Sequence, residues 1–141
     1  MQFQTPSGKP FEIPDDWWVF SEMQTWNRSG RRCFTPLPCA ECELIPLDAI
    51  VVPERRAGVA LLNKLRLVPV LMAFREGEHS FLPPIKVSGP WAGEDYPYRL
   101  RDGFHRYFAS VAAGFPYIPA QIISPEVDQR ASAAFAQGSG I

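Results

Sequence analysis

Apolar residues recur at helical spacing in two segments, which predicts one helix over 54–68 and another over about 104–113. The first helix is expected to stop at Pro69, because a proline disfavours helical backbone in the residue before it. Gly114 follows the second helix, where a C-cap glycine belongs. The apolar faces are formed by Leu61, Leu62, Leu65 and Val68 in the first helix and by Phe104, Phe108, Val111 and Ala112 in the second.

Shorter apolar or alternating runs predict the strands. They fall at 43–53 with a turn at Pro46, 70–74, the segment beginning at 83–87, 98–101 and the return segment 115–123. Helical and extended segments are interleaved, and 141 residues suit one domain.

The two ends of the chain lie outside this pattern. Residues 1–43 are irregular and carry several aromatic residues among Pro, Ser and Gly. Aromatic side chains bury a large apolar area, so we expect an extension packed over the core, with a short helix after Pro14. A partner surface or a base-stacking platform is the alternative for its tryptophans. Residues 124–141 open with Ser-Pro-Glu and predict a short helix with a frayed tail.

The composition is that of an ordinary globular protein, with 46% hydrophobic residues, 21% charged residues and a formal net charge of −1. This balance argues against a dedicated nucleic-acid-binding domain, and leaves a local basic patch open. The first ten residues lack an apolar signal core, and the run 67–74 is too short to cross a membrane. We therefore expect a cytoplasmic protein without a membrane partner.

Three cysteines, Cys33, Cys39 and Cys42, are spaced C-x5-C-x2-C. An odd number without an export signal predicts free thiols rather than a disulfide framework. A zinc site is the alternative, since Cys-x2-Cys is half of one, with His79, His105 or an acid completing the ligands.

The sequence Asp-Gly-Phe-His-Arg, residues 102–106, precedes the second predicted helix. The first N–H groups of a helix lack internal partners, and with the helix dipole they favour an anion. Gly103 lets the backbone approach a ligand closely, Arg106 can bind phosphate oxygens with its fork of donors, and His105 can supply a donor or a proton. The alternative is an ordinary turn in which Arg106 pairs with Asp102.

The stretches "PPIKVSG" and "YRLRDGFHRYFASVAAGFPYIPAQI" resemble a strand, a Gly-x-His-Arg helix start and a returning strand of the ParB/sulfiredoxin superfamily. "IPLDAIVVPERRAGVALLNKLR" is similar to its opening strand, arginine-bearing loop and first helix. The resemblance covers about 44–123 and implies an α+β fold, a mixed sheet with two main helices, whose corner binds nucleotide phosphates. The chain then divides into the extension 1–43, this domain 44–123 and the final helix and tail 124–141.

Two branches of the superfamily differ from this chain at the residues that define their activity. Sulfiredoxins carry a nucleophilic cysteine just before the His-Arg pair, where this chain has Phe104. Partition proteins of the ParB type continue into a helix-turn-helix, whereas about 18 residues follow Ile123 here. We therefore expect neither sulfinate repair nor centromere binding.

A third branch, the small-molecule kinases similar to free-serine kinase, shows Asp-Gly-x-His-Arg and an acid near the arginine loop. Asp102 and Glu54 match those acids, and Arg55 and Arg56 follow Glu54. The resemblance implies that Glu54 or Asp102 orients or deprotonates an acceptor, while the arginines and Mg²⁺ neutralise phosphates. The alternative is that Glu54 merely pairs with a neighbouring arginine.

We expect a nucleotide or other phosphate ligand, ATP with Mg²⁺ among the candidates, where the loop 52–56 meets the corner 102–106. Phosphotransfer or nucleotide hydrolysis by a Mg²⁺-dependent enzyme is the further expectation, and catalysis itself stays open. A non-catalytic module that binds a nucleic-acid backbone or a protein, or a ParB-like nuclease, is the alternative. Lys64 and Arg66 form a solvated face or a phosphate-facing rim. The oligomeric state stays open, a homodimer included.

Overall fold

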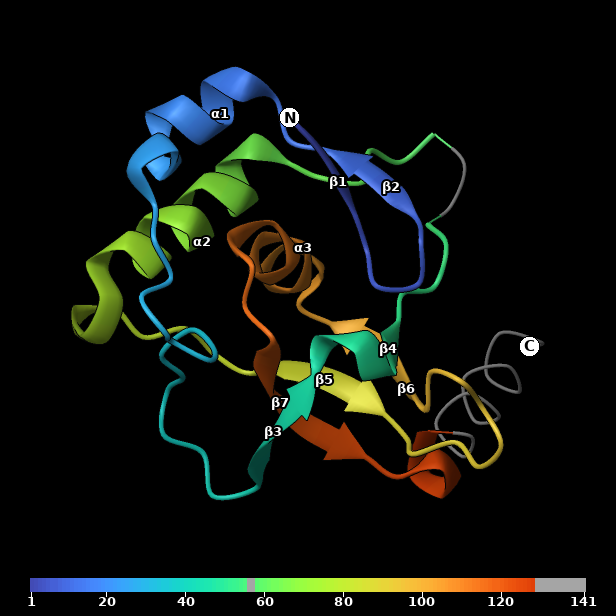
Figure 1. The fold of residues 1–141 in the computed structure, drawn as a ribbon. Helices are drawn as coiled ribbons and strands as arrows, with labels where there is room; N and C mark the ends of the chain where they lie inside the picture. The colour runs from blue at the N-terminus through green and yellow to red at the C-terminus, as the bar shows by residue number, and fades with distance from the viewer. Residues whose placement is uncertain (56–57, 129–141) are drawn as a thin grey trace, which may run out of the picture.

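The computed structural model describes residues 1–55 and 58–128, and its centre is a five-stranded mixed sheet in the order β3-β7-β5-β6-β4 (Figure 1). The strands are β3 Cys42–Pro46, β4 Ile50–Val51, β5 Ile85–Ser88, β6 Tyr98–Asp102 and β7 Tyr117–Ile123. Strand β7 runs antiparallel to β3 and parallel to β5, and β6 runs antiparallel to β5 and parallel to β4. A separate hairpin pairs β1, Gln2–Gln4, with β2, Pro10–Glu12.

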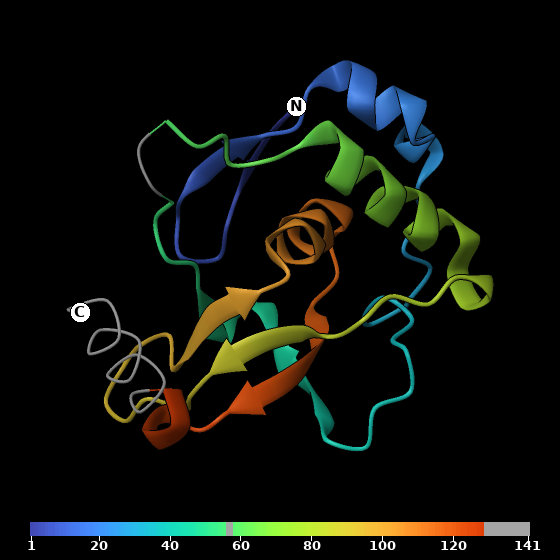
Figure 2. The ribbon, with the colours of Figure 1, turned by 180° about the vertical axis from the view of Figure 1, so that it is seen from behind.

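The main helices beside the sheet are α2 Lys64–Glu76 and α3 Phe104–Ala113, and a shorter helix, α1, spans Asp15–Phe20. Helix α3 lies between the sheet and α2, as both views show (Figures 1 and 2). Its residues Tyr107 and Phe108 are buried, and so are Leu71 of α2 and Ile85 of β5. Helix α3 is therefore the centre of the core, and the α+β class is confirmed.

The predicted bounds of the helix over 54–68 were wrong, and so was the predicted strand over 70–74, because the helix α2 begins at Lys64 and continues through residues 70–74. Gly58 takes a φ of +85°, and Asn63 is extended. The Oδ1 atom of Asn63 accepts the N–H of Leu65 at 2.9 Å, so the helix begins after this cap. Residues 54–55 and 58–63 precede the helix instead of forming it.

Pro69 lies inside α2 and does not stop it. Proline has no N–H, so the carbonyl of Leu65, four residues earlier, loses its usual helical donor. Leu65 itself is 85% exposed, so the proline lies in a part of the helix that borders solvent. The buried residues Leu67, Val70, Leu71 and Phe74 repeat at helical spacing on both sides of the proline.

The elements after α2 agree with the sequence predictions. Helix α3 spans 104–113, and Gly114 takes a φ of +82° with its N–H bonded to carbonyls of the last turn. The Oγ atom of Ser124 accepts the N–H of Val127 at 3.3 Å, as expected of a helix cap. The rest of the predicted final helix and tail, from residue 129 onward, lies outside the described residues.

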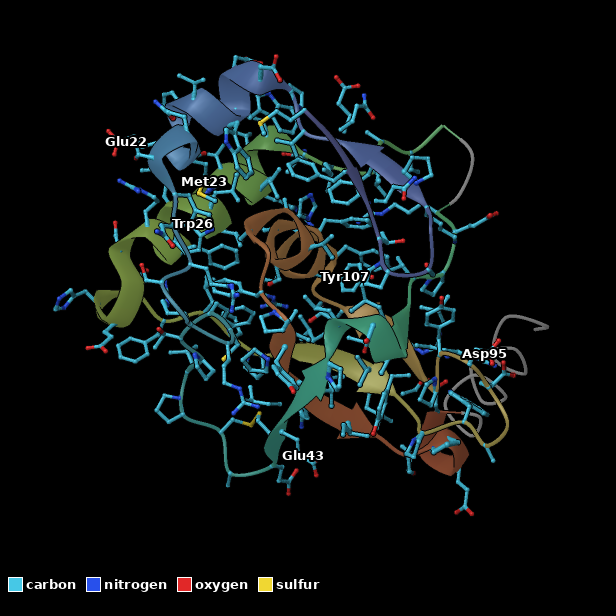
Figure 3. All side chains as sticks on the ribbon, viewed as in Figure 1. Glu22, Met23, Trp26, Glu43, Asp95 and Tyr107 are labelled. Atoms are coloured by element: carbon cyan, nitrogen blue, oxygen red, sulfur yellow. A yellow bond between two sulfur atoms is a disulfide. The ribbon has the colours of Figure 1, made fainter. Side chains whose placement is uncertain are left out.

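The N-terminal segment packs on the helices through Trp26 (Figure 3). The indole N–H of Trp26 donates to the carbonyl of Ala113 at 2.9 Å, where α3 ends. Its ring meets Phe115 edge-on, with 5.7 Å between the ring centroids. Arg31 donates to the carbonyl of Phe74 and lies over the Trp26 ring, so the segment is tied to both α2 and α3.

The prediction of free thiols was wrong for two of the three cysteines. Cys39 and Cys42 form a disulfide, and Cys33 is free. The two cysteines are only three residues apart, and a turn before β3 brings their sulfurs together. An odd number of cysteines does not reveal such a local pair. Within residues 1–55 and 58–128, no three His, Cys, Asp or Glu side chains gather where they could hold a metal ion.

In the part of the chain that the structure describes, no helix is both long and apolar enough to cross a membrane.

Replacing Trp26 by alanine is predicted to lower the free energy of unfolding by about 3 kcal/mol, because it removes a packed ring and the donor to Ala113. Urea unfolding followed by circular dichroism measures this change. Phe20→Ala is the matched control, since Phe20 belongs to the same segment but is 64% exposed. It should cost less than about 1 kcal/mol, and equal losses from the two variants would contradict the packing role of Trp26.

Candidate functional site

The candidate site is the corner where β6 ends and α3 begins. Gly103 joins the two elements with φ +99° and ψ 35°, a left-handed conformation that favours glycine. A Cβ atom at this position would lie 2.6 Å from Cγ2 of Ile85 and 2.8 Å from a terminal guanidinium nitrogen of Arg106. Both the backbone angle and the available space therefore require glycine, and the sharp turn starts the helix directly after the strand.

The first turn of α3 has unpaired backbone donors. The N–H of Tyr107 is bonded to the carbonyl of Gly103 at 2.9 Å, which closes the first turn. The N–H groups of Phe104, His105 and Arg106 precede it and have no partner within the helix. No side chain caps this end, and the first turn carries no acid. The helix dipole adds partial positive charge there, so the position favours an anion.

A cavity of about 240 Å³ opens at this helix start. Its polar and charged lining consists of Arg55, Arg66, Asp102, His105 and Arg106, and its apolar lining of Val70, Leu82, Pro83 and Phe104. Three arginines face one carboxylate, so the cavity has an excess of positive charge. The structure thus brings together most of the residues predicted to bind phosphate.

Arg106 forms an ion pair with Asp102 at 3.6 Å, as the alternative interpretation of the corner expected. The Arg106 side chain is 14% exposed, whereas that of Asp102 is 65% exposed. Burial lowers the pKa of Arg106, and Asp102 acts in the opposite direction. Arginine remains protonated in proteins, so a largely buried cation is balanced by one long contact to a solvated carboxylate. Such a cation can still bind a further anion.

Arg55 is held at the cavity by an aromatic ring. Its guanidinium carbon lies 4.5 Å from the ring centroid of Phe104, a cation–π contact. Phe104, the first residue of α3, thus supports an arginine beside the cavity. Arg56, the other predicted phosphate-binding arginine of the loop, lies outside the described residues.

The two predicted acids do not meet in one cavity. Asp102 lines the cavity at the start of α3, whereas Glu54 lines a neighbouring cavity of about 290 Å³ together with Lys9, Val52 and Phe108. Arg55 lines both cavities and lies between them. Glu54 is therefore adjacent to the corner, across Arg55 from Asp102.

Two contacts of α2 complete the site. Arg66, in the first turn of α2, lines the cavity. Of the two alternatives for this residue, a solvated face or a phosphate-facing rim, the structure favours the rim. The N–H of Asn63 donates to Nε2 of His105 at 2.9 Å and links the starts of α2 and α3. This bond was not predicted from the sequence, because Asn63 falls inside the helix predicted over 54–68. Recognising Asn63 as an N-cap would have been the signal for it.

His105 is neutral in this arrangement. Its Nε2 atom accepts a hydrogen bond, so the ring proton lies on Nδ1. Burial lowers the pKa of His105, and the neighbouring charges of Arg55 and Arg66 lower it further. The ring therefore offers one donor, Nδ1–H.

The chemistry available here is the binding of an oxyanion. Backbone N–H groups, guanidinium groups and one imidazole N–H are all donors. Among the described residues that line the cavity there is no Ser, Thr or Cys, and Asp102 is the one carboxylate. A side-chain hydroxyl or thiol nucleophile is thus absent from this lining, and acid–base chemistry would rest on Asp102.

Comparison with known proteins gives one solved structure. No family model matches the chain, and no curated protein matches it. A crystal structure of sulfiredoxin from Arabidopsis thaliana matches with 23% sequence identity and a TM-score of 0.46. The match covers 63% of this chain and 93% of the sulfiredoxin chain. Sulfiredoxin belongs to the superfamily that the sequence motifs resemble, and a likeness of this degree says nothing about activity or ligand.

Proposed function

We propose that the cavity at the start of α3 binds the phosphate of a nucleotide or of another phosphate-bearing small molecule. The observation that carries this proposal is that Arg55, Arg66 and Arg106 line one cavity with an uncapped helix N-terminus. Guanidinium groups and helix N-termini each favour phosphate, and here both line the same cavity.

The size of the cavity fits the phosphate end of a ligand. Cavities that enclose a whole drug-sized ligand span roughly 300–1,000 Å³, and this one measures about 240 Å³. The cavity therefore suits the phosphate group alone, and the remainder of the ligand would lie outside it. A nucleotide and a smaller phosphate ester both meet this condition.

The residues divide the task of holding the phosphate. The N–H groups of residues 104–106 bind one side of it, and the fork of Arg106 binds oxygens next to them. Arg66 is exposed and closes over the phosphate from α2, while Arg55 is kept in place by Phe104. His105 donates from Nδ1, since its Nε2 is occupied by Asn63.

Phosphotransfer or nucleotide hydrolysis is the catalytic extension of this proposal. Such reactions depend mostly on positioning and charge neutralisation, with one carboxylate at the acceptor. Asp102 is the carboxylate beside the phosphate, and Glu54 would serve an acceptor held in the neighbouring cavity. Mg²⁺ would arrive with the phosphates of ATP or another nucleotide, which is its usual mode of binding.

The first test is calorimetric titration of ATP, ADP, CTP and GTP, with and without Mg²⁺, against the wild type and Arg66→Gln. Arg66 is exposed, so its replacement should leave the fold intact. A charge-assisted hydrogen bond contributes about 1.5 kcal/mol, so Arg66→Gln should weaken binding about tenfold. Lys64→Gln is the matched control, because Lys64 lies in the same helical turn but over Phe20, outside the cavity.

Equal weakening by Arg66→Gln and Lys64→Gln would show a diffuse charge effect and would contradict a phosphate site in this cavity. Binding of an oligonucleotide but of none of the four nucleotides, with affinity that falls steeply with salt, would support the nucleic-acid-backbone alternative instead.

A second prediction concerns pH and the neutral state of His105. Its pKa in the folded protein is lowered from the usual 6.5, so the unfolded chain takes up this proton more readily. The free energy of unfolding is therefore fully retained above about pH 6.5 and falls as the pH drops towards the lowered pKa. Urea unfolding between pH 8 and pH 5 should show a steeper fall for the wild type than for His105→Gln. Parallel curves for the two proteins would contradict a neutral, hydrogen-bonded His105.

A further inference from the structure

The disulfide between Cys39 and Cys42 is not part of the lining of the proposed phosphate site. It closes the loop that leads into β3, at the edge of the sheet. Figure 3 places Glu43, the neighbour of Cys42, at the end of the molecule opposite α1. Cys39 is exposed and Cys42 is half-buried, so Cys39 is the more accessible of the two to solvent.

This disulfide contributes little to holding the fold together. It closes a loop with only two residues between the cysteines, and short loops gain the least from a cross-link. The chain before the loop is anchored separately, because the N–H of Leu37 donates to the carbonyl of Leu82 at 2.8 Å, and the N–H of Leu82 to that of Thr35 at 3.0 Å.

The chain after the loop is anchored as well. Strand β3 pairs with β7 from Cys42, opposite Gln121, to Pro46, opposite Tyr117. None of these backbone hydrogen bonds needs the sulfur–sulfur bond. The disulfide can therefore open while the fold on both sides of it stays in place.

The space beside the disulfide admits a reacting group. A cavity of about 220 Å³ is lined by both cysteines, by Leu37 and Leu44, and by prolines that include Pro119. An incoming thiol can thus approach Cys39 from solvent with its carbon chain against apolar side chains. Disulfide exchange needs such access to one sulfur.

We propose that Cys39 and Cys42 form a reversible dithiol–disulfide site that exchanges with an external thiol at Cys39. A thiolate attacks Sγ of Cys39, the bond between the two sulfurs breaks, and Sγ of Cys42 leaves with the electron pair and takes up a proton. A second thiolate attacks the external sulfur of this mixed disulfide and releases Cys39. Two electrons reduce the pair, and two external thiols are oxidised to one disulfide.

The test uses the full chain with Cys33→Ser, so that only the pair reacts. The protein is equilibrated in buffers of rising glutathione to glutathione disulfide ratio, and in parallel with reduced thioredoxin. Maleimide labelling with mass spectrometry counts the thiols, and circular dichroism follows the fold. Both thiols should appear together and reversibly in the folded protein. The unfolding midpoint should shift by less than about 10 °C.

Single variants assign the reacting sulfur. Cys42→Ser leaves Cys39 as a lone exposed thiol, which should form a mixed disulfide with glutathione disulfide at least about tenfold faster than the half-buried Cys42 of Cys39→Ser. Reduction by glutathione would assign small thiols as the partner, and reduction by thioredoxin alone would assign protein dithiols. Resistance to both reductants without denaturant, unfolding on reduction, or equal rates for the two variants would overturn the proposal.

Discussion

The close approach of Gly103 to Ile85 is the contact on which the candidate site depends. A side chain at position 103 would overlap Cγ2 of Ile85, and the φ of +99° excludes most other residues. Because the backbone turns so sharply there, α3 starts directly after β6, and its first N–H groups lie at the cavity. Arg106 packs against the same glycine, so one turn sets the positions of both the backbone donors and the buried cation.

The core then determines which other charges reach this corner. Helix α3 is enclosed by the sheet and α2, and the start of α2 is linked to it by the bond from Asn63 to His105. This placement brings Arg66 of α2 to the cavity, while the loop after β4 brings Arg55. Like charges meet here because the core places their elements side by side, and bound phosphate would relieve their repulsion.

Local sequence signals were sufficient to predict the bounds of α3 but not those of α2. The N- and C-terminal ends of α3 were predictable, since glycine is needed at both and its apolar face repeats regularly. The start of α2 was not predicted, because Asn63 was not recognised as its N-cap, and its end was not predicted, because Pro69 was taken as a stop. Arg66 was one of two residues for which a phosphate-facing rim was an open alternative, whereas the bond from Asn63 to His105 was not predicted. The pairing of Cys39 with Cys42 depends on a turn that a count of cysteines does not reveal.

The central claim is that the uncapped first turn of α3 binds phosphate. Titration of ¹⁵N-labelled protein with ADP, followed by amide chemical shifts, tests it most directly. The account predicts that the largest shifts occur at the amides of Phe104, His105 and Arg106, with saturation at one equivalent. Saturable shifts confined to other parts of the chain, or none at the first turn of α3 with ADP or with inorganic phosphate, would contradict it.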